Sequence, residues 1–102
     1  MCKFVIGAAL LALSACAPKS DPPVGPSFVW KCDSGVSITT RNTEGGNIEV
    51  VADGKTYHLP GVIAGSGARY FDGKVEFWEH AGEAMLNGAS GGPYEHCKLT
   101  GV

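Results

Sequence analysis

Short apolar segments alternate with turn-forming residues along residues 28–102. Asn47-Ile48-Glu49-Val50 and Val75-Glu76-Phe77 alternate polar and apolar side chains, as half-buried β-strands do. No window outside the N-terminal segment keeps a helical period for three turns. Together with the enrichment in β-branched and aromatic residues, the pattern predicts eight strands, over residues 28–32, 36–41, 47–52, 55–59, 68–71, 74–79, 83–87 and 94–100.

Two pairs of these segments are separated by turn dipeptides. Asp53-Gly54 and Asp72-Gly73 each leave a link of two residues, which is the strongest short-range signal for a β-hairpin. Eight short strands with such links favour a closed antiparallel barrel or a small sandwich. We therefore predict an all-β antiparallel fold, either an eight-stranded barrel or a small sandwich.

The N-terminal segment has a different pattern. Lys3 precedes an apolar run from Phe4 to Leu13, which is too short to span a bilayer because a spanning helix needs about 20 residues. A basic start, a short apolar centre and small residues at the exit predict a secretory signal peptide. Leu13-Ser14-Ala15-Cys16 resembles the end of a bacterial lipoprotein signal, in which the cysteine is acylated. The alternative is ordinary cleavage nearby, with Cys16 unmodified.

Three regions follow from this pattern. We expect a signal peptide over residues 1–15, a lipidated Cys16 with a Pro-rich tether over residues 16–27, and a folded domain over residues 28–102. The tether prediction rests on four prolines and one glycine in residues 17–27, which favour an extended chain. Ala17, in place of an aspartate after the lipidated cysteine, indicates anchoring to the outer membrane. We expect the domain to face the periplasm.

The two remaining cysteines, Cys32 and Cys97, stand near the two ends of the predicted domain. In an exported chain they favour a disulfide, here between the first and last strands. Such a bond closes a loop of 65 residues, which the chain-entropy model values at roughly 4 kcal/mol. The alternative is a metal site that also includes His96, although no C-x-x-C or H-x3-H spacing supports it.

Charge narrows the range of partners. After loss of residues 1–15, seven Lys and Arg side chains stand against ten Asp and Glu, a formal charge of −3. This mixed, acidic balance argues against a nucleic-acid partner. No polybasic patch points to a membrane surface, so membrane contact would come from the acyl chains. We expect no cofactor, no metal and no small-molecule substrate.

Residues 65–80, GSGARYFDGKVEFWEH, place Ser66 between two glycines. A hydrolase nucleophile elbow has G-x-S-x-G between a strand and a helix, whereas Ala64 and Ala68 flank this segment and no helix follows. A phosphate-binding loop would need G-K-[ST]. A simple loop whose glycines take positive φ explains the pattern better, and a catalytic serine stays the alternative.

The histidines and aromatic residues have simpler explanations. His58 and His96 are expected on outward faces of strands, and His80 at a hairpin tip with Ala81 and Gly82. Exposed turn residues carry function more often than strand residues do. The aromatic side chains in this part of the chain are predicted to fill the barrel core, namely Phe71, Phe77 and Trp78.

Several of these motifs together resemble a known signature. SGARY at residues 66–70, Phe77-Trp78 and Gly82-Glu83-Ala84 are similar to the pattern of the membrane-bound and periplasmic inhibitors of c-type lysozyme, S-G-A-R-Y followed by F/L-W-x-K-G-x-x-A. The framing cysteines, and Tyr57 and Leu59 before the loop, extend the resemblance over the whole domain. The lipoprotein signal points to the membrane-bound branch.

The resemblance implies an eight-stranded barrel that inserts a loop into the active-site cleft of c-type lysozyme. Ser66 would hydrogen-bond a catalytic carboxylate. His80 stands where the family has lysine and Ala81 where it has glycine, and Lys74 is a possible substitute cation. The expected lysozyme-binding residues are Ser66, His80, Gly65, Gly67, Arg69 and Tyr70.

The preferred hypothesis is therefore a lipid-anchored inhibitor without enzymatic activity, with c-type lysozyme as its partner. The first alternative is a structural or ligand-binding envelope lipoprotein on the same barrel, because the family lysine is missing. The second is an exported hydrolase that uses Ser66.

Overall fold

A computed structural model of the chain describes residues 21–101. The predicted signal peptide and Cys16 lie outside the described residues. Within that range the chain forms nine strands: β1 (Pro23–Lys31), β2 (Ser37–Thr43), β3 (Asn47–Ala52), β4 (Lys55–Leu59), β5 (Gly61–Val62), β6 (Ala68–Phe71), β7 (Glu76–His80), β8 (Glu83–Asn87) and β9 (Tyr94–Gly101). None of the described residues belongs to a helix that is long and apolar enough to cross a membrane.

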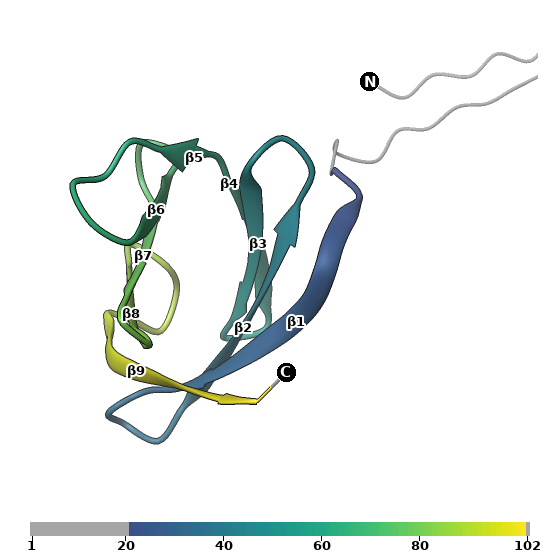
Figure 1. Ribbon diagram of the computed structural model, residues 1–102. Helices are drawn as coiled ribbons and strands as arrows, with labels where there is room; N and C mark the ends of the chain where they lie inside the picture. Colours follow the sequence, from purple (N-terminus) through teal and green to yellow (C-terminus); the bar gives the residue numbers. More distant parts are fainter. Residues whose placement is uncertain (1–20, 102) are drawn as a thin grey trace, which may run out of the picture.

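All strands belong to one antiparallel sheet with the order β4-β3-β2-β1-β9-β8-β7-β6-β5. The sheet curves into a nearly closed barrel, because its two edge strands, β4 and β5, are joined in the chain by Pro60 alone (Figure 1). The first and last strands pair with each other, Trp30 opposite Leu99 and Lys31 opposite Lys98. The predicted all-β antiparallel barrel is confirmed.

The strand count differs by one from the prediction. The additional strand, β5, has two residues, Gly61 and Val62, which pair with Tyr70 and Arg69 of β6. Two residues are too few to show an alternating pattern in the sequence. Gly61 also passes so close to Gly46 that a Cβ there would lie 2.3 Å from the Gly46 carbonyl oxygen. The short strand is therefore set by packing.

Strand β1 begins earlier than predicted, since residues 23–27, assigned to the tether, belong to the sheet. Proline lacks an N–H group and is tolerated where a strand edge is unpaired. Only Val29–Lys31 of β1 pair with β9, so the first part of β1 has a free edge for Pro23 and Pro26. A shift in register between Pro23 and Ser27 accompanies this irregular start.

Of the two predicted tight hairpin links, one is confirmed and the other is longer than predicted. Asp53-Gly54 joins β3 to β4, and both residues take positive φ (53° and 71°), as a type I′ turn requires. Asp72-Gly73 instead belongs to a longer link, because β7 begins only at Glu76. The Asp72 carboxylate accepts hydrogen bonds from the backbone amides of Lys74 (2.8 Å) and Val75 (2.7 Å) and so replaces ladder pairing.

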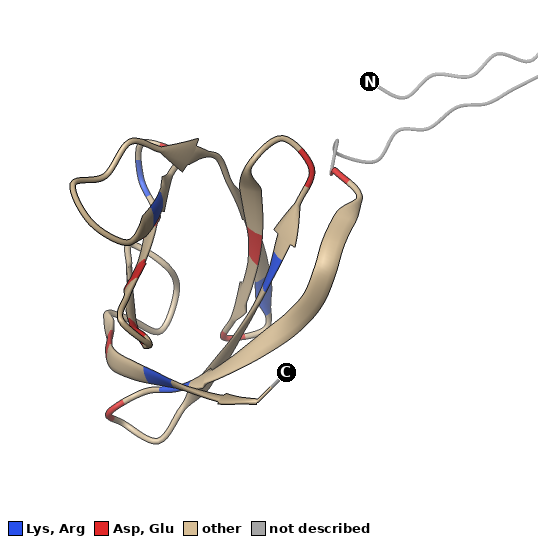
Figure 2. Ribbon diagram, in the orientation of Figure 1, with Lys and Arg blue, Asp and Glu red and all other residues tan. Residues whose placement is uncertain are grey.

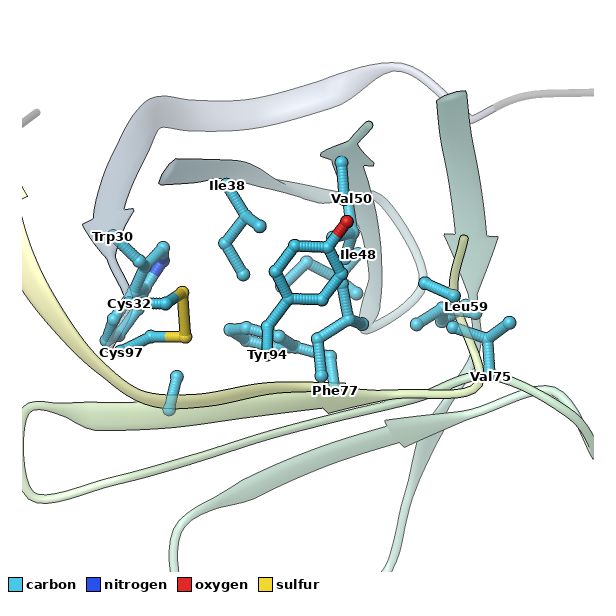
Figure 3. Packing of buried hydrophobic residues seen from close by; sticks show 14 residues of the cluster. Trp30, Cys32, Ile38, Ile48, Val50, Leu59, Val75, Phe77, Tyr94 and Cys97 are labelled. Carbon is cyan, nitrogen blue, oxygen red and sulfur yellow. A yellow bond between two sulfur atoms is a disulfide. The ribbon is translucent and has the colours of Figure 1, made fainter. Parts of the chain in front are cut away.

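The core fills the barrel from both walls (Figure 3). Trp30 meets Phe77 edge to face at 5.8 Å between ring centroids, and its indole N–H donates to the buried Thr40 hydroxyl at 3.0 Å. The Cys32–Cys97 disulfide lies beside Trp30 and ties the residue after β1 to β9. This confirms the predicted pairing, and it excludes the alternative metal site because both thiols are used.

Candidate functional site

Ser66 lies in the loop that joins β5 to β6, which extends away from the barrel (Figure 1). Gly65, Ser66 and Gly67 are all exposed. Gly67 has φ 71°, and a Cβ on it would lie 2.1 Å from the Glu79 carbonyl oxygen and 3.0 Å from His80 Cβ. Only glycine allows the loop to run against β7 in this conformation, which explains the second glycine of the motif.

Trp78 holds this loop from the outside of the barrel. Its indole N–H donates a hydrogen bond of 2.9 Å to the backbone carbonyl of Ser66. Trp78 is half-buried on the outer face, because its neighbour Phe77 points into the core. Phe71 is also half-buried outside the core, 5.3 Å from the Arg69 guanidinium. The prediction of core packing is therefore right for Phe77 and wrong for the other two aromatic residues.

His80 is the last residue of β7, and it is exposed. The link to β8 is Ala81-Gly82, with φ of 54° and 81°, so the predicted hairpin tip is confirmed. Ala68 pairs with Glu79, which places Gly67 beside His80. The fold thus brings the Ser66 loop and the His80 turn together, although fourteen positions separate them in the chain.

The Ser66 hydroxyl makes no hydrogen bond to any residue within 21–101, so it is free to bind a partner. Arg69 and Tyr70, by contrast, are engaged within the chain. The Arg69 guanidinium pairs with Glu76 on the neighbouring strand. Tyr70 accepts a hydrogen bond of 3.1 Å from the Asn42 amide and packs against Phe77 at 6.2 Å. These contacts fix β6, the strand that follows the Ser66 loop.

An open groove of about 410 Å³ continues from His80 across the outside of β7, β8 and β9. Its lining comprises Trp78, His80, Glu83, Ala84, Met85, Glu95 and His96. Ala84 pairs with Cys97 and Leu86 with Tyr94, so Met85 alone stands opposite two residues of β9. His96 takes positive φ (52°) in this bulge, and both Glu95 and His96 face outward.

His96 lies beside a carboxylate at this groove. Its Nδ1 lies 2.7 Å from a carboxylate oxygen of Asp33. The hydrogen bond and the charge of Asp33, together with the charges of Glu83 and Glu95, raise the pKa of His96 above its ordinary value. The outward position predicted for His96 is confirmed. The contact with Asp33 was missed, because the two residues are 63 positions apart in the chain.

The arrangement has the properties of a contact surface. Ser66 lies in a loop between two strands, and the described part of the chain provides no helix after it, so the nucleophile-elbow geometry is not formed. No group of three or more His, Cys, Asp or Glu within residues 21–101 is placed to hold a metal ion. A free hydroxyl, an imidazole and an apolar loop instead stand together on the surface.

Comparisons with known proteins relate this chain to proteins that bind lysozyme. Residues 30–94 match the family model described as membrane-bound lysozyme-inhibitor of c-type lysozyme. The membrane-bound lysozyme inhibitor of C-type lysozyme from Yersinia enterocolitica serotype O:8 / biotype 1B (strain NCTC 13174 / 8081) is 29% identical over 79 residues, which are 78% of this chain and 66% of that protein. The crystal structure of Pseudomonas aeruginosa MliC in complex with hen egg white lysozyme is similar with a TM-score of 0.56 and 26% identity, over 90% of this chain and 99% of that one.

Ala81 offers a test of the turn geometry. The left-handed conformation costs an alanine about 1–2 kcal/mol, whereas glycine adopts it freely. The greater flexibility of glycine in the unfolded chain offsets about 0.4–1 kcal/mol of this gain in stability. We expect Ala81→Gly to raise the free energy of unfolding by up to about 1 kcal/mol, measured by urea denaturation. The control Ala68→Gly, in strand β6, should lower it; a loss of stability in Ala81→Gly would contradict the assigned turn.

Proposed function

Because the chain belongs to the family of membrane-bound lysozyme inhibitors of c-type lysozyme, we propose that it binds c-type lysozyme and blocks the active-site cleft with the Ser66 loop and the His80 turn. The observation that carries the proposal is the contact between Gly67 and the end of β7, which holds both elements side by side. The protein catalyses nothing in this proposal, and its effect is to protect peptidoglycan.

The chemistry of the target cleft suits these two groups. A retaining glycosidase holds two carboxyl groups about 5 Å apart. The unpartnered Ser66 hydroxyl would donate to one carboxylate, and protonated His80 would pair with the other. Hydrogen bonds to charged groups are strong when water is displaced, so a few contacts are enough to block the site.

His80 is the cation that this geometry supports. Lys74, the possible substitute, lies in the link before β7, at the opposite end of that strand from His80. Because Phe71 pairs with Glu76 next to this link, whereas Ala68 pairs with Glu79, Lys74 is remote from the Ser66 loop. A histidine carries full positive charge only in acid, so this departure from the family lysine makes inhibition depend on pH.

Arg69 and Tyr70 would act indirectly. Their contacts with Glu76 and Asn42 fix β6, and β6 in turn positions Ser66 against the partner. Gly65 and Gly67 would let the backbone approach the cleft wall closely. Together with Ser66, these roles account for all residues of the motif at positions 65–70 except Ala68.

The membrane anchor is also a proposal. Residues 1–15 would be the signal peptide, and Cys16 would carry the lipid that attaches the barrel to the outer membrane, facing the periplasm. Because β1 begins at Pro23, only residues 17–22 are left as the tether. The inhibitory barrel would therefore work close to the membrane surface.

Removal of the Ser66 hydroxyl is the first test. Ser66→Ala should weaken binding to c-type lysozyme about tenfold to a hundredfold, because a hydrogen bond to a charged group contributes about 1.5–3 kcal/mol. Inhibition assays with c-type, g-type and i-type lysozymes measure this loss and the selectivity. Thr56→Ala, which removes an exposed hydroxyl on β4, is the matched control and should change nothing.

The outcomes of that assay separate the candidate functions. No inhibition by the unmodified chain would favour the non-inhibitory envelope lipoprotein. Full inhibition by Ser66→Ala would exclude the role given to the hydroxyl.

His80 is tested through the dependence of inhibition on pH. Inhibition by the unmodified chain should strengthen as pH falls from 8 towards 6, whereas His80→Lys should inhibit more strongly at pH 8 and lose this dependence. The inhibition constants of the two proteins are measured against the same lysozyme, and their ratio at each pH removes the effect of the titration of the enzyme itself. His96→Asn controls for the second histidine of the groove and should keep the dependence. An identical pH profile in His80→Lys and the unmodified chain would refute the role of His80.

Lipidation is tested by mass spectrometry of the protein recovered from bacterial envelopes. The mature chain should begin at Cys16 and carry the mass of acyl groups, and Cys16→Ser should lack that mass. An unmodified N-terminus at a neighbouring residue would show ordinary cleavage instead.

A further inference from the structure

Ile63 is the most exposed large hydrophobic residue among residues 21–101. Its exposed fraction is 95%, whereas the other exposed hydrophobic side chains range from 37% to 50%. Its neighbour Val62 is also exposed, at 37%. Single exposed apolar residues are common on protein surfaces, so the position of Ile63 decides whether it has a role.

Ile63 opens the same loop that carries Ser66. The loop starts after β5 and ends at β6, so only Ala64 and Gly65 separate the two residues. Its base is closed by the pairing of Val62 with Arg69, and its far side is held by the bond from Trp78 to Ser66. The backbone of the loop is thus fixed at both ends while the Ile63 side chain points into solvent.

The loop is also free of charge. Residues 61–67, GVIAGSG, contain no Asp, Glu, Lys or Arg, and the ribbon of the protruding loop is tan throughout in Figure 2. Burial of charged side chains against a partner is costly, whereas apolar and small side chains lose water at little cost. This segment is therefore suited to enter a site from which water is excluded.

We infer that Ile63 is an apolar anchor that fills a sugar-binding subsite of c-type lysozyme next to the carboxylate bound by Ser66. The inference rests on the proposed function and adds a specificity-determining residue to it. Ligand clefts are lined mainly by apolar and aromatic side chains with a few polar groups. Ser66 and His80 match the polar groups of such a cleft, and Ile63 matches its apolar wall. Apolar anchors of this kind supply much of the affinity of protein interfaces.

The test compares apolar surface inside and outside the loop. Ile63→Ser should weaken inhibition of c-type lysozyme about tenfold to a hundredfold, the loss expected when one large apolar side chain is no longer buried. Ile63→Leu should stay within about threefold of the unmodified chain. Val51→Ser removes a 39%-exposed valine from β3, on the opposite wall of the barrel from β7, and should leave affinity unchanged. Thermal melts of each variant show that the barrel is folded.

The failure of this inference differs from the failure of the proposed function. If Ile63→Ser inhibits as strongly as the unmodified chain while Ser66→Ala inhibits more weakly, the role of Ile63 as an anchor is refuted. The proposed block of the lysozyme cleft by Ser66 and His80 is then unaffected. If the unmodified chain does not inhibit c-type lysozyme, both are refuted. Flotation with phosphatidylethanolamine–phosphatidylglycerol vesicles tests whether Ile63 binds a membrane instead of lysozyme. Vesicle binding that Ile63→Ser abolishes, with unchanged lysozyme affinity, would also overturn the anchor.

Discussion

The pairing of β1 with β9 is the contact on which the closed shape of this barrel depends. All other neighbouring strands in the sheet follow one another in the chain, so a hairpin or short link already holds them close. Strands β1 and β9 share only three paired positions, and the Cys32–Cys97 disulfide and the bond from Thr100 to the Val29 carbonyl reinforce them. In a domain too small for a large core, a covalent tie worth roughly 4 kcal/mol is a large share of the stability.

Closure of the barrel determines the position of the loop that carries Ser66. Once β1 and β7 face each other across the interior, Trp30 and Phe77 meet in the core. Because strand side chains alternate, the residue after Phe77 must point outward. That residue is Trp78, whose indole N–H holds the Ser66 carbonyl. The position of the loop is therefore a consequence of core packing one residue away.

The local patterns in the sequence were sufficient for the antiparallel strands, the disulfide and the His80 hairpin tip, whereas the choice of a barrel over a sandwich came from the family resemblance. Alternation and turn dipeptides are properties of neighbouring residues, and four strands have the predicted bounds. The features that were missed depend on distant residues. The strand β5 exists because Gly61 packs on Gly46, and the His96 bulge sets two residues against Met85. The candidate site was proposed from the family resemblance, whereas the contacts that support it, such as the hydrogen bond from Asn42 to Tyr70, need the three-dimensional fold.

The departure from the family pattern at His80 and Ala81 can be divided into two separate effects. Register between β7 and β8 continues to the last pair, His80 with Glu83, and leaves a link of two residues. This link has positive φ at both positions, as in a type I′ turn, so Ala81 takes this conformation at an energetic cost. The pairing thus sets the position of residue 80, whichever residue occupies position 81. Loss of the glycine affects stability, and loss of the lysine affects charge. The pairing of β7 with β8 therefore fixes the backbone at position 80, and under the proposed function the difference from the family pattern lies in the side chain that this position presents.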